Sequence, residues 1–280
     1  MPFWNRGIKS IILLISVCIA LSSCTWATRY SCYSRHVDHD KAMALVPVAT
    51  AFEEWLDQTG AQLVVAARRG QNFDRYGFEF SHAAFLKKEE NGWFAYHLLN
   101  ICPSDKGGLF KEGMLNFLAP ATQNYRIAIV APKPEIQAKL ATLLDSKSER
   151  DSVFNPHYNA AAYPFGTEKQ NSTNWLLEFF SKAVADKPIH DRVDAIQWLQ
   201  QDHYEPAVVD VGKMKQLFID LVLPQMSTAG HPAEGTANNQ FLISSADSAL
   251  HYISRYSIVP ACDKKSETLG EKICIFQVLN

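Results

Sequence analysis

Several features that mark particular classes of protein are missing from this chain. It carries 27 lysines and arginines against 29 aspartates and glutamates, a net charge of −2, and it has no run of basic residues. That balance argues against a nucleic acid as its partner. The six cysteines include no CxxC pair, so a cysteine-based metal site is not expected. Internal repeats and low-complexity segments are absent as well.

Long apolar runs are also scarce, and the one that is present lies at the amino terminus. It spans residues 11–21 (IILLISVCIAL), follows Arg6 and Lys9, and is too short to cross a bilayer as a helix. A positive region followed by an apolar core of this length is typical of a signal peptide. No second stretch approaches membrane length, so we expect no transmembrane helix after the signal.

The apolar run ends in the sequence LSSC at residues 21–24. Small residues directly before a cysteine fit the site cut by the lipoprotein signal peptidase, so we expect cleavage before Cys24 and lipid on that cysteine. An ordinary secretory signal with a chance cysteine is the alternative. Two or more acyl chains suffice as an anchor. Thr25 stands where aspartate would mark retention in the inner membrane, which favours a periplasm-facing lipoprotein of the outer membrane.

These processing signals divide the chain into three parts. Residues 1–23 are the expected signal peptide, residues 24–40 a solvated tether, and residues 41–280 a single domain. Its length and the 47% hydrophobic content are sufficient for an ordinary globular core. The sequence HVDHD at residues 36–40 could bind a metal. Because it falls in the expected tether, we predict no metal site, and no cofactor is expected.

Four cysteines remain for the mature domain after Cys24 takes lipid. Four thiols in an oxidising compartment allow three pairings. Cys262 and Cys274 bracket a polar loop between two apolar segments, as expected of a disulfide that closes a local hairpin. Cys32 and Cys102 are then left to pair with each other.

The spacing of apolar residues predicts an α+β domain. We expect helices at residues 43–56, 134–144, 172–185, 189–200 and 212–221, and strands at 63–67, 78–86, 93–99, 126–131, 250–259 and 273–278. Asn91 and Gly92 are a strong signal for a hairpin between the second and third strands, and Ser172 or Thr173 is expected to cap the third helix. The order predicts an antiparallel sheet with packed helices and a closing hairpin.

Three positions could carry chemistry. His82 begins a predicted strand, His97 lies on the neighbouring hairpin strand, and Ser172 lies at the mouth of a helix. A hydroxyl there is close to free helix N–H groups, which favour developing negative charge. A histidine in reach would act as general base, and a second polar side chain would fix its tautomer. Each residue also has a structural interpretation, as a satisfied strand histidine or a helix cap.

A set of short motifs resembles a bacterial family called domain of unknown function 2145. They cover roughly residues 60–205 in the order of the family. The matching segments are residues 65–71 (VAARRGQ), 76–78 (YGF), 80–83 (FSHA), 97–100 (HLLN) with Cys102, 112–115 (EGML) before Phe117, 158–159 (YN), 163–165 (YPF), and 170–175 (QNSTNW) running into Leu177 and Glu178.

That family in turn is similar to circularly permuted papain-like proteins, the NlpC-like and lecithin–retinol-acyltransferase-like group. In this group a histidine strand precedes a helix that starts with the nucleophile. The resemblance implies that His82 is the base, His97 the orienting residue and Ser172 the nucleophile. Family members often have cysteine where this chain has Ser172, and an unactivated hydroxyl is a much weaker nucleophile than a thiol.

The resemblance implies two alternative functions. The serine favours an envelope lipoprotein that keeps a papain-like module without turnover or with weak activity. The alternative is an amide or ester hydrolase or acyltransferase that uses Ser172 with His82. In either case the expected partners are the membrane, through the lipid anchor, and an envelope substrate or protein.

The lipid anchor leads to a first prediction. Replacing Cys24 with alanine should release the protein from membranes or leave the signal uncleaved, because lipid is attached to this sulfur. Membrane fractionation and gel mobility measure both effects. Cys18→Ala is the matched control, since Cys18 lies inside the expected signal peptide and its loss should change neither readout. A Cys24→Ala protein that fractionates and migrates like wild type would show that the chain is not a lipoprotein.

Overall fold

The computed structural model describes residues 39–70, 73–102, 104–120, 125–210, 226–258 and 272–277. The predicted signal peptide, Cys24, all but the last two residues of the predicted tether and the predicted helix at 212–221 lie outside these ranges. Within them, no helix combines the length and the apolar character needed to cross a bilayer.

The described residues form a seven-stranded sheet in which every pair of neighbours is antiparallel. Its strands run in the order β4-β3-β2-β1-β5, with β8 and β9 both pairing with β5. They are β1 (Leu63–Arg68), β2 (His82–Glu89), β3 (Gly92–Asn100), β4 (Gly107–Gly113), β5 (Ile127–Pro132), β8 (Ser257–Ile258) and β9 (Cys274–Phe276). A two-stranded sheet pairs β6 (Ala207–Asp210) with β7 (Gln240–Ile243).

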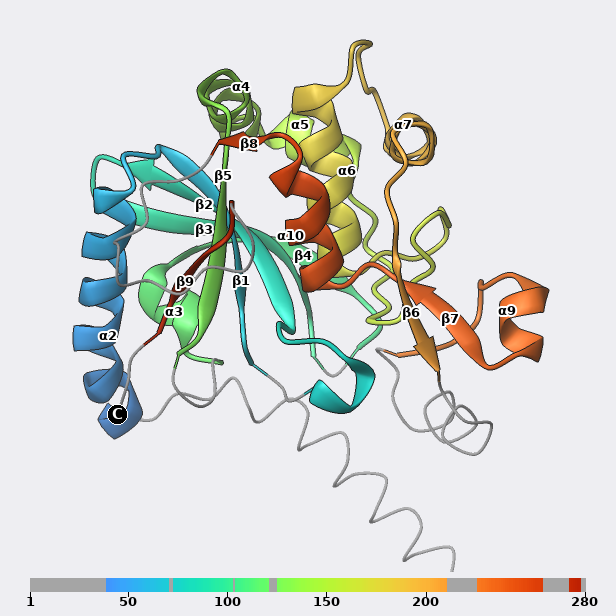
Figure 1. The fold of residues 1–280 in the computed structure, drawn as a ribbon, viewed down its shortest axis with the longest axis horizontal. Coiled ribbons are helices and arrows are strands. Elements are labelled where there is room, and N and C mark those ends of the chain that lie inside the picture. The colour runs from blue at the N-terminus through green and yellow to red at the C-terminus, as the bar shows by residue number, and fades with distance from the viewer. Residues whose placement is uncertain are drawn as a thin grey trace, which may run out of the picture.

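Helices cover both faces of the large sheet (Figure 1). They are α2 (His39–Gln58), α3 (Met114–Leu118), α4 (Pro134–Asp145), α5 (Lys147–Ser152), α6 (Ser172–Val184), α7 (Arg192–Gln201), α9 (Ala233–Ala237) and α10 (Ala246–Ser254), with a 3-10 turn η1 (Asp74–Tyr76). α2 and α3 pack on one face, called here the α2 face, and α4, α6 and α10 on the other, the α6 face. The expected class, α+β with an antiparallel sheet and packed helices, is confirmed.

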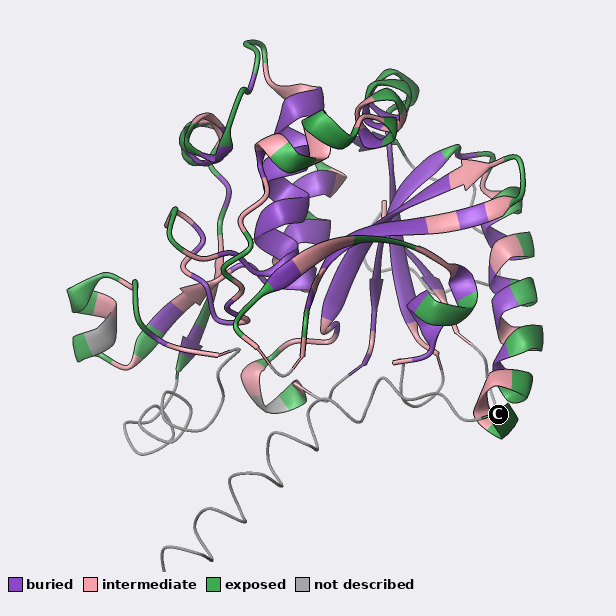
Figure 2. Cartoon of the chain, turned by 180° about the vertical axis from the view of Figure 1, so that it is seen from behind, coloured by how far each residue is buried: buried purple, intermediate pink, exposed green. Residues whose placement is uncertain are grey.

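The α6 face holds the larger core. The apolar side of α6 lies against β2, where Phe85 contacts Trp175 edge-on at 6.0 Å between ring centroids and Phe179 at 5.7 Å. α6 is buried along nearly its whole length (Figure 2). Alanines at 67 and 83 keep the strand surface low beneath it, so that the aromatic rings reach the sheet.

The α2 face is covered by a helix whose apolar positions recur every three or four residues. Leu45, Ala49, Phe52 and Leu56 are buried against the sheet, as the periodicity predicts. The helix begins at His39, so it extends two residues into the predicted tether.

Most strands near the centre of the sheet follow the prediction. β1, β3 and β5 match the expected strands within one or two residues, and Gly92 adopts φ +118° at the predicted hairpin, where Glu89 pairs with Gly92. β2 is displaced, since it begins at His82 and continues to Glu89. The sequence analysis does not predict β4, because its sequence GGLFKEG has too little periodicity to indicate a strand. It does not predict the short helix α3 either.

The strand predicted at 250–259 is wrong. Residues 246–254 form helix α10, and only Ser257 and Ile258 are extended, as β8. Ser245 caps the helix in a capping box with Ser248, and Ala246, Ala249, Leu250 and Ile253 are its buried positions. Spacings of three, four and seven residues are helical, and they outweigh the β-branched residues later in the segment.

The predicted closing hairpin is also wrong. β8 and β9 do not pair with each other, because each pairs with a different part of β5. Cys102 and Cys274 are each disulfide-bonded. In each predicted pair the other cysteine, Cys32 or Cys262, lies outside the described residues, so the pairing itself stays a prediction.

A buried ionic network fixes the long loop before α6. Arg192 donates from Nε to Glu178 Oε2 at 2.7 Å and from Nη2 to Oε1 at 2.9 Å, and its remaining donors reach carbonyls of residues 166, 167 and 169. Gln170 donates to Glu178 Oε2 at 2.6 Å and to the Val153 carbonyl at 2.8 Å. Burial raises the pKa of Glu178 to about 7, although Arg192 and Gln170 oppose this shift.

This network yields a stability prediction. Arg192→Met leaves the buried Glu178 without its cation and should lower the free energy of unfolding by about 3–5 kcal/mol near neutral pH. The loss should be largest above about pH 7 and shrink as the pH falls, because a protonated Glu178 needs no cation. Denaturant unfolding at several pH values measures it.

The control is Lys147→Met, which removes one partner of the exposed Lys147–Asp151 pair. A change of about 0.5 kcal/mol or less is expected there. Equal effects of the two substitutions would show that the Glu178–Arg192 pair does not stabilise the fold as described.

Candidate functional site

Three side chains from three neighbouring strands form a hydrogen-bonded row. His82 Nε2 lies 2.9 Å from His97 Nδ1, and His97 Nε2 lies 3.0 Å from Glu112 Oε2. The two imidazole rings are 5.1 Å apart between centroids and inclined at 59°. We call this row of His82, His97 and Glu112 the histidine relay.

The strand register explains why these residues meet. Side chains alternate between the faces of a sheet, so His82 lies on the same face as Ala84 and Leu86, which pack beneath α2 and α3. His97 shares that face with Ala95, and its ring lies 6.3 Å from that of Phe117 on α3. The relay is therefore on the α2 face. The two histidines, which the sequence places on neighbouring strands, are thus within hydrogen-bond distance of each other.

The hydrogen bonds determine which ring nitrogen carries each proton. A carboxylate only accepts, so His97 donates from Nε2 to Glu112. A neutral His97 then has its lone pair on Nδ1, and His82 must donate to it from Nε2. The lone pair of neutral His82 is left on Nδ1. The relay thus directs the basic atom of His82 away from His97, while Glu112 supplies the negative charge that stabilises an imidazolium.

A fixed positive charge lies beside the relay. Arg68 is the strand partner of His82, and its guanidinium lies over the Phe117 ring at 5.6 Å from the centroid. Gly70 makes room for it: a Cβ at this position would lie 2.7 Å from Arg68 Nη1 and 2.8 Å from Ser81 Oγ. Any side chain at position 70 would therefore push the guanidinium away from its place.

The polar row is almost completely buried. Arg68 is 7%, His82 8% and His97 2% exposed, whereas the Glu112 side chain is 23% exposed. Polar groups this deep are costly unless they are hydrogen-bonded, at about 1–3 kcal/mol for each unsatisfied group. Clusters of buried ionisable groups are found at functional sites more often than elsewhere, which makes the relay the candidate site of this chain.

Ser172 lies away from the relay. It is the first residue of α6, which packs on the opposite face of the sheet, and no hydrogen bond joins its hydroxyl to either imidazole within the described residues. Asn171, and not Ser172 or Thr173, caps the helix by accepting from the Asn174 N–H at 2.7 Å. The structure thus brings together His82 and His97 but does not bring Ser172 to them.

The remaining site predictions concern metals and lipid. In the ranges that the structure describes, no group of three or more histidine, cysteine, aspartate or glutamate side chains is arranged to hold a metal ion. Cys24, the predicted lipid attachment site, lies outside those ranges.

Two relay-side residues were not singled out from the sequence. Arg68 and Glu112 stand in segments with family resemblance, but no role was assigned to either. The signal that could have identified them is strand alternation, because Arg68 follows Val64 and Ala66 on the α2 face, and Glu112 precedes Met114 there. Finding Glu112 would also have required predicting β4.

Comparison of the chain with known proteins finds a match to one family model. The model of a family described as an uncharacterized protein conserved in bacteria (DUF2145) matches residues 55–253, which is more than half of the chain and includes the whole relay. No curated protein and no solved structure matches. The papain-like resemblance is therefore not confirmed.

Proposed function

The chain belongs to the bacterial DUF2145 family, and from this premise we propose that it is an envelope lipoprotein in which His82 acts as a general base on an ester or amide. The observation that carries the proposal is the hydrogen-bonded row from His82 through His97 to Glu112. A base held by a second polar group, which is itself anchored by a carboxylate, is the arrangement that general-base catalysis requires.

The reaction supported best is hydrolysis with water as the nucleophile. His82 Nδ1 takes a proton from water while the oxygen forms a bond to the acyl carbon. The tetrahedral intermediate then loses its alcohol or amine, which leaves with the proton from His82. His97 and Glu112 are positioning residues that hold the ring and stabilise its charged form. The Arg68 guanidinium supplies positive charge for the developing oxyanion.

Ser172 has no part in this proposal, because α6 lies on the other face of the sheet. This differs from the role that family resemblance implies for it. The membrane location rests on the sequence LSSC at residues 21–24, which fits lipid attachment at Cys24.

A second function, binding without turnover, is favoured by one observation. Both imidazoles are more than nine-tenths buried, and a buried polar row can also be retained to specify a fold. In that case the relay fixes the pairing of β2, β3 and β4, and the envelope partner binds elsewhere on the domain. The two functions differ in whether the loss of the imidazole base abolishes a measurable reaction.

The experiment is hydrolysis of p-nitrophenyl butyrate by the purified chain. Wild type should exceed the buffer rate, and His82→Gln should lower kcat/KM by about 10²-fold or more, the usual contribution of a general base. Glu112→Gln keeps a similar shape without the charge. It should reduce the rate and move the rising limb of the pH–rate profile to lower pH, because a less stabilised imidazolium makes a weaker base.

Ser172→Ala is the matched control, and its rate should equal that of wild type. A rate that falls with Ser172→Ala and not with His82→Gln would contradict the proposal. A wild-type rate no higher than that of folded His82→Gln would also overturn it and leave binding without turnover.

A further inference from the structure

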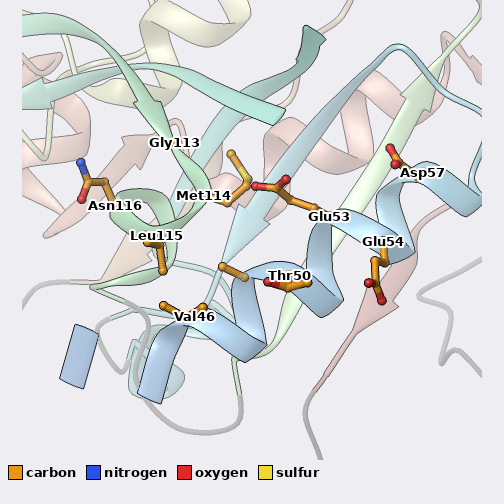
Figure 3. Close-up of a pocket in the computed structure, with 10 residues that line it drawn as sticks. Val46, Thr50, Glu53, Glu54, Asp57, Gly113, Met114, Leu115 and Asn116 are labelled. Atoms are coloured by element: carbon orange, nitrogen blue, oxygen red, sulfur yellow. The ribbon is translucent and has the colours of Figure 1, made fainter. Parts of the chain in front are cut away.

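A groove of about 590 Å³ lies between α2 and the start of α3 (Figure 3), and none of the three relay residues lines it. Val46 and Ala49 of α2 form one wall, and Met114 and Leu115 of α3 form the other. In the close-up, the Leu115 side chain lies above that of Val46, so apolar side chains of the two helices face each other across the groove.

The apolar lining of this groove reaches solvent. Val46 is 44% and Leu115 42% exposed, and Met43, one turn earlier on α2, is 60% exposed. Large apolar side chains that gather on one surface indicate a contact with another molecule, whereas a single exposed one does not.

Carboxylates line the other end of the groove. Glu53 and Glu54 are adjacent on α2, Asp57 follows one turn later, and Glu53 reaches towards Met114. Asp57 is already paired with Lys88 at 2.7 Å. Glu53 and Glu54 form no ion pair with any residue that the structure describes. The groove therefore carries two carboxylates that a cation could still neutralise.

The surroundings of Glu53 indicate which charge an occupant of the groove should carry. Burial raises the pKa of Glu53, the nearby Asp57 carboxylate acts in the same direction, and the Trp93 backbone N–H opposes them. An ammonium or guanidinium group in the groove would stabilise the ionised carboxylate. Complementary charge thus specifies a cationic occupant.

We propose that this groove binds a basic peptide segment of a partner protein, with a lysine or arginine beside Glu53 and Glu54 and a neighbouring apolar side chain between Val46 and Leu115. An anionic lipid headgroup is disfavoured by the carboxylates. A second copy of this chain would need to present a basic segment to the same groove.

The test is fluorescence polarisation with the full chain in detergent. The probe is a dye-labelled, acetylated pentapeptide in which leucine alternates with lysine, and its twin has glutamine in place of lysine. The lysine peptide should bind about tenfold more tightly at low salt, and added salt should reduce the difference. Glu53→Gln/Glu54→Gln should remove most of that preference, and Leu115→Ser should weaken binding of the lysine peptide by about fivefold or more.

The control is Glu135→Gln/Glu168→Gln, which changes the net charge equally at two exposed positions outside the groove and should leave both affinities unchanged. Equal binding of the two peptides, or the same loss in the control, would overturn the proposal. A dimer in sedimentation that Leu115→Ser dissociates would also overturn it, because a second copy would then occupy the groove.

Discussion

Two hydrogen bonds, between His82 and His97 and between His97 and Glu112, join three strands on a sheet face whose core is largely apolar. Their geometry depends on the register of β2, β3 and β4, since a shift of one residue in any strand would turn its polar side chain to the other face. The same register places Phe85 under α6 and Ala84 under α2 and α3. The relay and the two cores are thus consequences of one alignment.

The two faces of the sheet differ in how they are packed. On the α6 face, aromatic packing and the Glu178–Arg192 network hold a long loop and a nearly fully buried helix. On the α2 face, the packing is interrupted by the polar row from Arg68 to Glu112 and by the groove between α2 and α3. Departures from apolar packing are costly, and on the α2 face they are the polar row on which the proposed function rests.

How far the sequence predicts this structure depends on the kind of signal. Period-2 alternation and the Asn91–Gly92 turn are local, and they correctly predict the hairpin that brings His82 and His97 together. No local pattern in the sequence indicates the side of the sheet on which α6 packs. The prediction that Ser172 joins His82 therefore lacks this information, and the sheet lies between α6 and the relay. In the tail, the prediction of a strand at residues 250–259 overlooks the helical spacing of Ala246, Leu250 and Ile253. Glu112 was missed because the glycines of β4 conceal its periodicity.

The most direct test of the relay is ¹⁵N NMR of the histidine side chains at neutral pH. We expect His82 and His97 both to carry their proton on Nε2, and a coupling across the hydrogen bond to connect His82 Nε2 with His97 Nδ1. Glu112→Gln should leave the His82 tautomer in place and weaken that coupling. A proton on His82 Nδ1, or two rings without mutual coupling, would contradict the relay.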